Sequence, residues 1–184
     1  MKKDLRIIKT QKMLHNALLS LLEVKAFEEI KVSDICNEAL INRSTFYAHY
    51  NDKYELLLDT INNLKSSFLE NLNENEHDID TREYYIELIK LLLNHIEEEK
   101  KVYQSMLLHN RNSIVMDILL DVARKDIEKR LENDKNIKTS VPIDILAKFY
   151  IGAFASIAMD WLKDSSKYTK QELINYINIL IPTI

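Results

Sequence analysis

A cluster of hydrogen-bonding side chains between residues 42 and 49 is the part of this 184-residue chain best equipped for recognition chemistry. Phe46 and Tyr50 stand four residues apart, a spacing that turns both rings toward the same face of a helix. The opposite face then presents amide, guanidinium, hydroxyl, phenol and imidazole groups: Asn42, Arg43, Ser44, Thr45, Tyr47 and His49. Such groups form hydrogen bonds with base edges and phosphates, so the pattern predicts contact with double-stranded DNA.

Two short helices are expected to position this cluster. Ser33 is a candidate N-cap of the first helix, because the negative charge of the next residue, Asp34, suits a helix N-terminus. Asn42 is a candidate N-cap of the second helix, and a third helix is expected to begin at Asn51 or Asp52. Helices this short are not stable alone, so packing against neighbours must hold them. Two short helices joined by a tight turn are typical of a helix-turn-helix, whose second helix lies in the major groove of DNA.

Residues 41–57, INRSTFYAHYNDKYELL, resemble the recognition helix and the following linker helix of the TetR family of bacterial transcription regulators. The pattern of that family is roughly A-G-V-S-x-G/S-T-[LF]-Y-x-[HY]-F-x-x-K-x-x-L. Matching slots hold Ala39, Ile41, Asn42, Ser44, Thr45, Phe46, Tyr47, His49, Tyr50, Lys53 and Leu56, and IKVSDI upstream matches the usual start of the preceding helix. The resemblance is specific over residues 1 to about 60 and only architectural beyond them.

Leu40 is the clear departure from the family pattern, which usually has Gly at this position. Glycine would serve a turn with positive φ, a conformation that leucine resists. We therefore expect the turn between the two short helices to be reshaped, which would change the angle of the recognition helix but not its existence.

Arg43 is the strongest candidate for reading bases, because a guanidinium can donate two hydrogen bonds to guanine O6 and N7. Binding of Arg43 to phosphate is the alternative. Thr45 could meet a thymine methyl group or donate a hydroxyl hydrogen bond, while Tyr47 and His49 are expected to reach phosphates. The full set of predicted DNA contacts, with the lysines expected at the backbone, is Lys9, Lys31, Ser33, Asn42, Arg43, Ser44, Thr45, Tyr47, His49 and Lys53.

The composition predicts an all-α chain. One Gly and two Pro leave little material for hairpin turns, which favour Gly or Asn-Gly. No run of about eighteen residues is free of charge and the N-terminus lacks an apolar signal core, so we expect neither a membrane span nor secretion. The single Cys36 cannot form an internal disulfide, which agrees with a reducing cytoplasm.

Charge is unevenly distributed along the chain, whose net charge is −4. Residues 1–53 hold nine Lys and Arg against seven Asp and Glu, a net charge of +2, and the remaining residues carry −6. At the start a single acid, Asp4, stands among five basic residues: Lys2, Lys3, Arg6, Lys9 and Lys12. A basic N-terminal region on an acidic remainder would orient the protein toward DNA. The alternative is that these residues only increase solubility.

The spacing of apolar residues predicts a helix over residues 5–23 and further helices along the rest of the chain. The first three are expected to form a bundle with a core of Leu14, Leu18, Leu21, Phe27, Ile35, Ala39, Ile41 and Phe46. Residues 73–80 are predicted to form the loop that ends a linker helix. We predict a helix-turn-helix DNA-binding domain over residues 1–50. A linker helix and a regulatory and dimerisation domain, together about five to six helices, would occupy residues 51–184.

Residues 142–163 are apolar nearly all round, which in a soluble protein predicts burial on every side. A last helix is expected over residues 171–180. In the resembling family the last two helices commonly pair with those of a second chain, so the resemblance implies a homodimer with a four-helix interface. The residues expected in that interface are Phe149, Gly152, Ala155, Ser156, Met159, Ile174 and Ile177. The alternative is that both helices belong to the internal core of one chain.

Aromatic, Met and His side chains after residue 80 could line a pocket for a small-molecule effector. Only the family resemblance supports this interpretation, because such residues at helical spacing usually form core. The candidates are Tyr85, Ile89, Leu92, His95, Tyr103, Met106, Met116, Tyr150 and Phe154.

Sites for catalysis, cofactors and metals are not indicated. Gly152 is the only glycine, so neither a phosphate-binding loop nor a nucleophile elbow can be built, and no two His residues share the helical spacing of a metal site. We therefore expect no cofactor, no metal and no enzymatic activity. His15 is expected on the surface of the first helix, and Cys36 in the core.

These features lead to a hypothesis of a cytoplasmic, homodimeric transcription regulator that binds a palindromic operator in double-stranded DNA. The resemblance implies a repressor that an unidentified small-molecule effector releases, by shifting the population away from a conformation that fits two half-sites about one helical turn apart. The main alternative is a regulator of the same fold that acts through a protein partner and does not bind DNA. An enzyme is a distant third.

Overall fold

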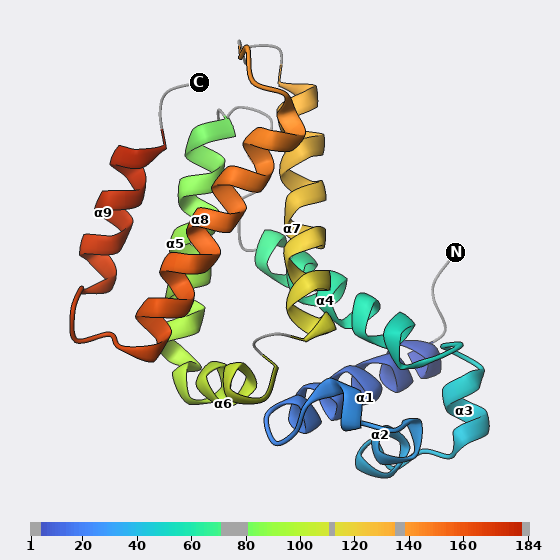
Figure 1. Cartoon of the computed structure of the whole chain (residues 1–184). Coiled ribbons are helices and arrows are strands. Elements are labelled where there is room, and N and C mark those ends of the chain that lie inside the picture. The colour runs from blue at the N-terminus through green and yellow to red at the C-terminus, as the bar shows by residue number, and fades with distance from the viewer. Residues whose placement is uncertain (1–4, 71–80, 111–112, 135–138, 182–184) are drawn as a thin grey trace. The chain divides into compact units, whose positions relative to one another are not determined.

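The computed structural model describes residues 5–70, 81–110, 113–134 and 139–181, and within these ranges it consists of helices without strands. In chain order (Figure 1) the elements are α1 (Leu5–Leu22), the short 3-10 helix η1 (Phe27–Glu29), α2 (Val32–Glu38), α3 (Arg43–Tyr47), α4 (Lys53–Glu70), α5 (Thr81–Glu98), α6 (Lys100–Asn110), α7 (Ile114–Asn133), α8 (Ile143–Lys163) and α9 (Lys170–Leu180). The predicted all-α fold is confirmed. The loop predicted over residues 73–80 lies outside the described residues, as do Lys2, Lys3 and Asp4.

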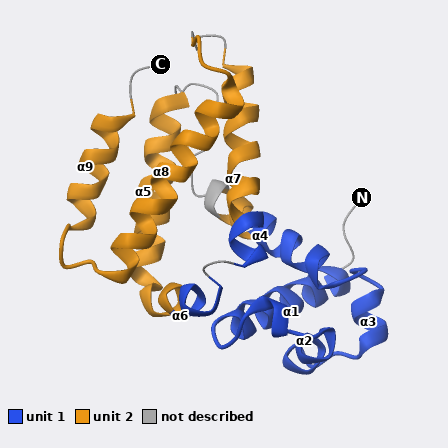
Figure 2. Ribbon diagram, viewed as in Figure 1, with its two compact units in different colours: residues 1–63, 105–118 blue, residues 64–104, 119–184 orange. Residues whose placement is uncertain are grey.

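The chain divides into two compact units (Figure 2). Unit 1 comprises residues 1–63 and 105–118, and unit 2 comprises residues 64–104 and 119–184. The helices α4, α6 and α7 therefore contribute residues to both units.

Unit 1 is organised around large apolar side chains that solvent does not reach. The fully buried members are Leu14, Leu18, Leu22, Phe27, Ile30, Ile35, Phe46, Leu56 and Leu57. Two residues predicted for this core, Leu21 and Ile41, are only half-buried. In α1 the inward position belongs to Leu22, because it continues the i, i+4 row that Leu14 and Leu18 begin.

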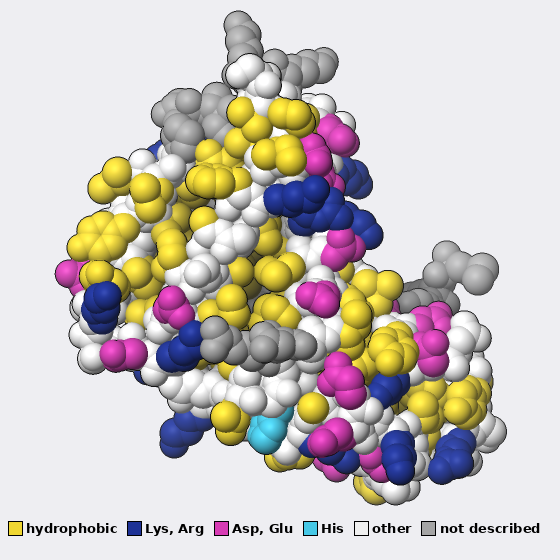
Figure 3. Space-filling model, in the orientation of Figure 1, with side chains coloured by type: hydrophobic (Ala, Val, Ile, Leu, Met, Phe, Trp, Pro, Cys, Tyr) yellow, Lys and Arg dark blue, Asp and Glu magenta, His cyan; other side chains and the backbone are white. Residues whose placement is uncertain are grey.

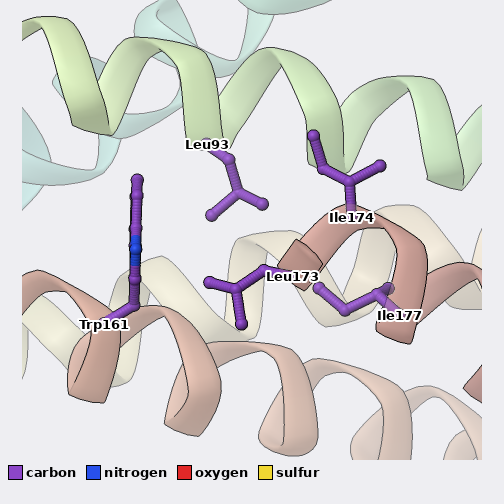
Figure 4. Close-up of a cluster of buried hydrophobic side chains, with 5 residues drawn as sticks. All are labelled: Leu93, Trp161, Leu173, Ile174 and Ile177. Atoms are coloured by element: carbon purple, nitrogen blue, oxygen red, sulfur yellow. The ribbon is translucent and has the colours of Figure 1, made fainter. Parts of the chain in front are cut away.

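Two apolar clusters hold the described helices of unit 2. In the first, side chains from α5, α8 and α9 point toward one another (Figure 4): Leu93, Trp161, Leu173, Ile174 and Ile177. The indole N–H of Trp161 donates to the carbonyl oxygen of Tyr168 at 2.9 Å, so the polar edge of this buried ring is satisfied. In the second cluster, Ile127 and Leu131 of α7 meet Ala147 of α8.

α8 is less buried than its composition predicts. Phe149 is 68% exposed, and Ile145, Gly152 and Ser156 are exposed as well. Only the side that carries buried residues such as Ala147 packs against helices of the same chain, so the expected burial on every side is wrong. By length and composition alone, α8 is long and apolar enough to cross a membrane, and 22% of its most apolar window is buried. The core helix of a soluble protein passes the same test, so one such helix is weak evidence for a membrane span.

Candidate nucleic-acid interface

All ten predicted DNA contacts lie in unit 1, on or beside α1 to α4. Lys9 is exposed on α1, and Lys31 is exposed immediately before α2. Residues 42–49 contain α3, which follows α2 directly in the chain (Figure 1). The structure therefore brings the predicted contacts into one compact unit, although they come from four separate helices.

The start of α2 is capped by an acid and not by the predicted serine. α2 begins at Val32, so Ser33 lies in its first turn and cannot be the N-cap. The Asp34 carboxylate accepts hydrogen bonds from the backbone N–H of Lys31 at 3.1 Å and from Lys25 Nζ at 3.0 Å. The Lys31 N–H, and after it the Lys25 ammonium, lowers the pKa of Asp34 below its ordinary value.

The turn between α2 and α3 keeps the left-handed geometry that glycine favours, although Leu40 occupies it with a φ of 54°. The Leu40 N–H donates to the Asn37 carbonyl at 3.2 Å, and the Ile41 N–H donates to the Cys36 carbonyl at 3.0 Å. These are the two bonds of a Schellman motif. The expected reshaping of the turn is therefore wrong. Because its side chain is 87% exposed, Leu40 is strained only against its own backbone, at about 1–2 kcal/mol.

α3 is oriented by two buried rings, as its spacing predicts. Phe46 and Tyr50 are both buried, with ring centroids 6.0 Å apart. Tyr47 packs edge-on against Phe46 at 5.4 Å between centroids but stays largely exposed. Arg43 and Ser44 are exposed on the other side. The polar side of this short helix is therefore open to solvent.

Asn42 is the N-cap of α3, as predicted, and it also holds two hydroxyl groups. Its Oδ1 accepts the backbone N–H of Thr45 at 3.2 Å. The same oxygen accepts the Ser44 hydroxyl at 2.9 Å and the Thr45 hydroxyl at 2.7 Å. His49, beyond the end of α3, is half-buried with its ring 6.3 Å from that of Tyr50.

Lys53 is engaged within the protein. Its Nζ donates to the carbonyl oxygens of Phe27 at 2.8 Å, Glu28 at 3.1 Å and Ile30 at 2.8 Å, which uses all three ammonium hydrogens. The ammonium also lies 4.5 Å from the centroid of the Phe27 ring. Partial burial lowers the pKa of Lys53. A phosphate could bind this ammonium only in place of one of the three carbonyls.

A polar network that the sequence did not reveal joins α1 to α4. His15 is buried and not on the surface: its Nε2 lies 3.1 Å from Tyr50 Oη and 2.9 Å from Asp59 Oδ2. Tyr50 Oη donates to the same carboxylate oxygen at 2.5 Å. Burial, and after it the bond to Asp59, raises the pKa of Tyr50, so the phenol remains a donor. No helical spacing relates residues 15, 50 and 59, which is why pattern analysis missed them.

Residues 105–113 belong to unit 1 although nothing in the sequence signals it. Asn110 is buried, accepts the backbone N–H of Phe27 at 2.9 Å and donates to the carbonyl of Leu22 at 3.0 Å. Ser105 Oγ donates to the Glu23 carbonyl at 2.5 Å. These bonds satisfy backbone groups where α1 ends and the chain turns toward η1.

The predicted effector-pocket residues are divided between the two units. Met106 and Met116 belong to unit 1, and the other seven belong to unit 2: Tyr85, Ile89, Leu92, His95, Tyr103, Tyr150 and Phe154. The rings of His95 and Tyr103 meet edge-on at 5.6 Å, and burial raises the pKa of Tyr103 to about 12. Across the described ranges, no group of three or more His, Cys, Asp and Glu side chains could hold a metal ion.

The predicted dimer-interface residues differ in exposure and fall into three groups. Phe149, Gly152 and Ser156 lie exposed on α8, and Figure 3 shows hydrophobic side chains over α8 and α9 on this face of the molecule. A Cβ built on Gly152 would meet nothing within 4 Å. Ala155 and Met159 are half-buried. In contrast, Ile174 and Ile177 are buried in the internal cluster around Trp161, while Ile179 and Leu180 of α9 are exposed.

Comparison with protein families and curated proteins points to transcription regulators. A TetR-type family model described as "Transcriptional regulator C-terminal region" matches residues 83–183, more than half of the chain. The chain is 34% identical over 126 residues to the HTH-type dhaKLM operon transcriptional activator DhaS of Lactococcus lactis subsp. lactis (strain IL1403). This match covers 66% of the chain and 64% of DhaS. The chain is also 36% identical over 70 residues to the uncharacterized HTH-type transcriptional regulator YxbF of Bacillus subtilis (strain 168). This match covers 38% of the chain and 18% of YxbF. The chain thus spans less than two thirds of either relative.

Solved structures share the fold over nearly the whole chain. A TetR transcriptional regulator from Streptococcus agalactiae 2603V superposes with a TM-score of 0.64 at 27% identity, covering 95% of this chain and 94% of that one. Lin0861 from Listeria innocua superposes with a TM-score of 0.70 at 24% identity, covering 98% and 93% of the two chains. The second likeness, at this identity, concerns the fold alone.

Proposed function

The chain belongs to the TetR family of transcriptional regulators, and we propose that it regulates transcription by binding a palindromic operator in double-stranded DNA as a homodimer. The main support is the orientation of α3, whose buried Phe46 and Tyr50 leave polar side chains open on the other side. We call the outward side chains of Asn42, Arg43, Ser44, Thr45 and Tyr47 the recognition face. A helix held in this way fits a major groove about 12 Å wide.

Six of the ten predicted contacts have the following proposed roles. Arg43 would read guanine, because it is exposed on the recognition face and can donate two hydrogen bonds. Lys9, Lys31, Tyr47 and His49 would bind phosphates and fix the orientation of α3. Lys53 would act differently, because its ammonium is already bound to three carbonyls of residues 27–30. We propose that it positions the loop before α2 and the start of α4.

The homodimer would form through the exposed apolar face of α8 and α9. This face carries Phe149, Gly152 and Ser156, with Ala155 and Met159 at its border. Ile179 and Leu180 take the place of Ile174 and Ile177, which are buried inside the chain. Covering an apolar side chain of this size contributes about 1.5–3 kcal/mol. Two-fold pairing of the chains would match the symmetry of a palindromic operator.

Repression is the proposed outcome of operator binding, because a bound dimer excludes other proteins from the same DNA. DhaS is described as an activator, so a promoter fusion assayed with and without the regulator would establish the sign for this chain. An effector bound among the aromatic side chains of unit 2 would release the operator by favouring a different conformation. The proposed location is the cytoplasm, where bacterial DNA is found.

Selection of bound sequences from a random DNA pool at fixed salt concentration tests the proposal. The expected result is a palindrome with half-sites about one helical turn or a multiple apart, bound more weakly as salt increases. Arg43→Ala should relax base preference at one position of each half-site, whereas Lys101→Ala, an exposed control on α6, should not. Equal weakening on operator and random DNA would make Arg43 a phosphate contact. Enrichment of no sequence would refute operator binding and favour action through a protein partner.

A further inference from the structure

The hydroxyl groups of Ser44 and Thr45 have a fixed hydrogen-bond polarity. Ser44 Oγ lies 2.9 Å from Asn42 Oδ1, and Thr45 Oγ1 lies 2.7 Å from the same atom. A hydroxyl has one donor hydrogen and two acceptor lone pairs. Each hydroxyl donates its hydrogen to Asn42, so only lone pairs remain for another molecule.

The backbone identifies the accepting atom of Asn42 as oxygen. The N–H of Thr45 points to this atom at 3.2 Å, and an amide nitrogen could not accept it. A hydroxyl oxygen within 2.9 Å of a carbonyl oxygen must supply the hydrogen between them, because two acceptors repel each other. The acceptor state of both hydroxyls therefore follows from positions of heavy atoms alone.

Both hydroxyls belong to the recognition face. Ser44 is exposed and Thr45 half-buried, whereas the next residue, Phe46, is fully buried on the opposite side. Arg43, immediately before them, has only donors. The recognition face therefore places one donor side chain beside two acceptor side chains.

We propose that Asn42 sets the base preference of the recognition face: by holding Ser44 and Thr45 as acceptors, it makes them select the exocyclic amino groups of adenine or cytosine. In the major groove adenine N6 and cytosine N4 are the donors, whereas guanine and thymine present acceptors. Serine and threonine free of such a partner can bond to either kind of group. The inference rests on the proposed DNA binding and specifies its chemistry. Asn42 acts through its neighbours as a positioning residue.

The contacted base pairs can be located by comparing selections from a random DNA pool. Wild-type protein, Ser44→Ala and Thr45→Val would each be used, because each variant removes one hydroxyl with little change in shape. A position whose preference weakens in a variant is the one that the missing hydroxyl contacts. Wild-type protein should select adenine or cytosine on the contacted strand at these positions.

Base analogues then test the amino group itself on wild-type protein. Replacing adenine by 2-aminopurine moves the amino group to the minor-groove edge and keeps two hydrogen bonds to thymine. Pyrimidin-2-one in place of cytosine removes the amino group. Binding should weaken about 5- to 10-fold, the effect of about one lost hydrogen bond. The same analogue placed outside the half-sites is the control and should leave binding unchanged.

Two variants of Asn42 separate positioning from simple capping of α3. Asn42→Asp keeps an acceptor oxygen, so it should retain the preference for amino groups while its negative charge weakens binding to every sequence. Asn42→Ala frees both hydroxyl hydrogens, so at these positions the variant should accept guanine or thymine nearly as well as adenine or cytosine. Thermal unfolding shows whether each variant is folded. If Asn42→Ala does not fold, the analogue measurement on wild-type protein still tests whether the hydroxyls accept from base amino groups.

Any of three results would overturn the inference and leave the proposed function intact. One is equal binding of wild-type protein to the parent and analogue duplexes. Another is selection of guanine or thymine at the positions that depend on Ser44 and Thr45, and the third is the absence of any such position. If the pool yields no enriched sequence at all, the proposed function fails, and the inference with it.

Discussion

Unit 1 and unit 2 differ in how many large side chains each buries fully. Of the eleven largest fully buried side chains in the part of the chain that the structure describes, ten belong to unit 1 and only Leu93 to unit 2. Both units also expose large apolar side chains, among them Leu5, Leu40 and Leu108 in unit 1 and Phe149, Ile179 and Leu180 in unit 2. Since burial of an apolar side chain contributes about 1.5–3 kcal/mol, more of the stability within one chain comes from the core of unit 1 than from that of unit 2. The proposed pairing of two chains would cover Phe149, Ile179 and Leu180 of unit 2.

Polar side chains bond to the backbone in both units, but they differ in burial. In unit 1, Asn110 and Lys53 bond to backbone carbonyls and so fix the course of the chain. In unit 2, Arg82 bonds to the carbonyls of Asn178 and Ile181, and Arg124 pairs with Asp121 and Glu128 on one helix surface. Partly exposed pairs of this kind contribute about 0–1 kcal/mol, whereas a buried group left without its partner costs about 1–3 kcal/mol. The buried Asn110 should therefore be more sensitive to substitution than the partly exposed Arg124.

Truncation of one buried and one exposed phenylalanine should show the largest contrast. Phe46→Ala should lower the free energy of unfolding by about 3–5 kcal/mol, because the ring is fully buried in unit 1. Phe149→Ala removes the same ring from a site that is 68% exposed, so dilute monomeric protein should lose less than about 1 kcal/mol. Urea unfolding followed by circular dichroism measures both. Similar losses in the two variants would refute the difference between the units.

Asn110→Ala should show the next largest effect. It leaves the Phe27 N–H and the Leu22 carbonyl without their partner, and we expect a loss of about 2–3 kcal/mol. Amide hydrogen exchange at Phe27 should accelerate in the variant. The control is Asn37→Ala at an exposed position of α2, where a change below about 0.5 kcal/mol is expected. A tolerant Asn110 with unchanged exchange at Phe27 would show that these bonds do not hold unit 1 together.

Pairing of two chains gives the contrast in unit 2. Phe149→Glu places a charge on the exposed apolar face of α8, and Gly152→Leu overfills a site where close approach is expected. Each should weaken the dimer by about 1–3 kcal/mol, or about 5- to 150-fold in dissociation constant. Leu108→Glu, on α6 with 79% of its side chain exposed, is the control and should leave the dimer unchanged. Sedimentation velocity over a concentration series measures all four proteins. A wild-type monomer at micromolar concentration would refute the proposed interface.

Local sequence patterns were sufficient where neighbouring residues decide the structure. The spacing of Phe46 and Tyr50 predicts the inward side of α3, and Asn42 predicts its start, because a cap and a helical turn involve residues within four positions. In contrast, His15 and Asp59 are 44 residues apart, and Phe27 and Asn110 are 83 apart. No periodicity connects such partners, so polar residues that hold unit 1 together looked like surface residues.

Pattern analysis also could not choose between two apolar sides of the same helix. Ile174 and Ile177 face the internal cluster, while Ile179 and Leu180 face solvent, and all four are equally apolar in the sequence. Which side packs against the same chain depends on where α5 and α8 lie, and that is a property of the folded unit. For the same reason, the apolar composition of α8 led to the wrong prediction that this helix is buried on every side. Composition shows how much apolar surface a helix has, but not what covers that surface.

Leu40 is an exception to the good packing of unit 1, and it should give the smallest effect. Its left-handed backbone is disfavoured by about 1–2 kcal/mol for a residue with a Cβ, and its exposed side chain gains little from packing. Leu40→Gly removes this strain but gives the unfolded chain more freedom, which offsets part of the gain. The expected net stabilisation is about 0.5–1 kcal/mol, or an increase in melting temperature of about 1–4 °C for a chain of this length.

Leu40→Ala is the matched control, because it removes nearly all of the same side chain and keeps the Cβ that causes the strain. Alanine should therefore leave the melting temperature close to that of wild-type protein, while glycine raises it. If both substitutions raise it equally, the exposed leucine side chain, and not the backbone conformation, is what destabilises the turn. If neither does, the two Schellman hydrogen bonds at Asn37 and Cys36 hold the left-handed conformation without measurable strain. In that case, unit 1 does not need the glycine that the family usually has at this position.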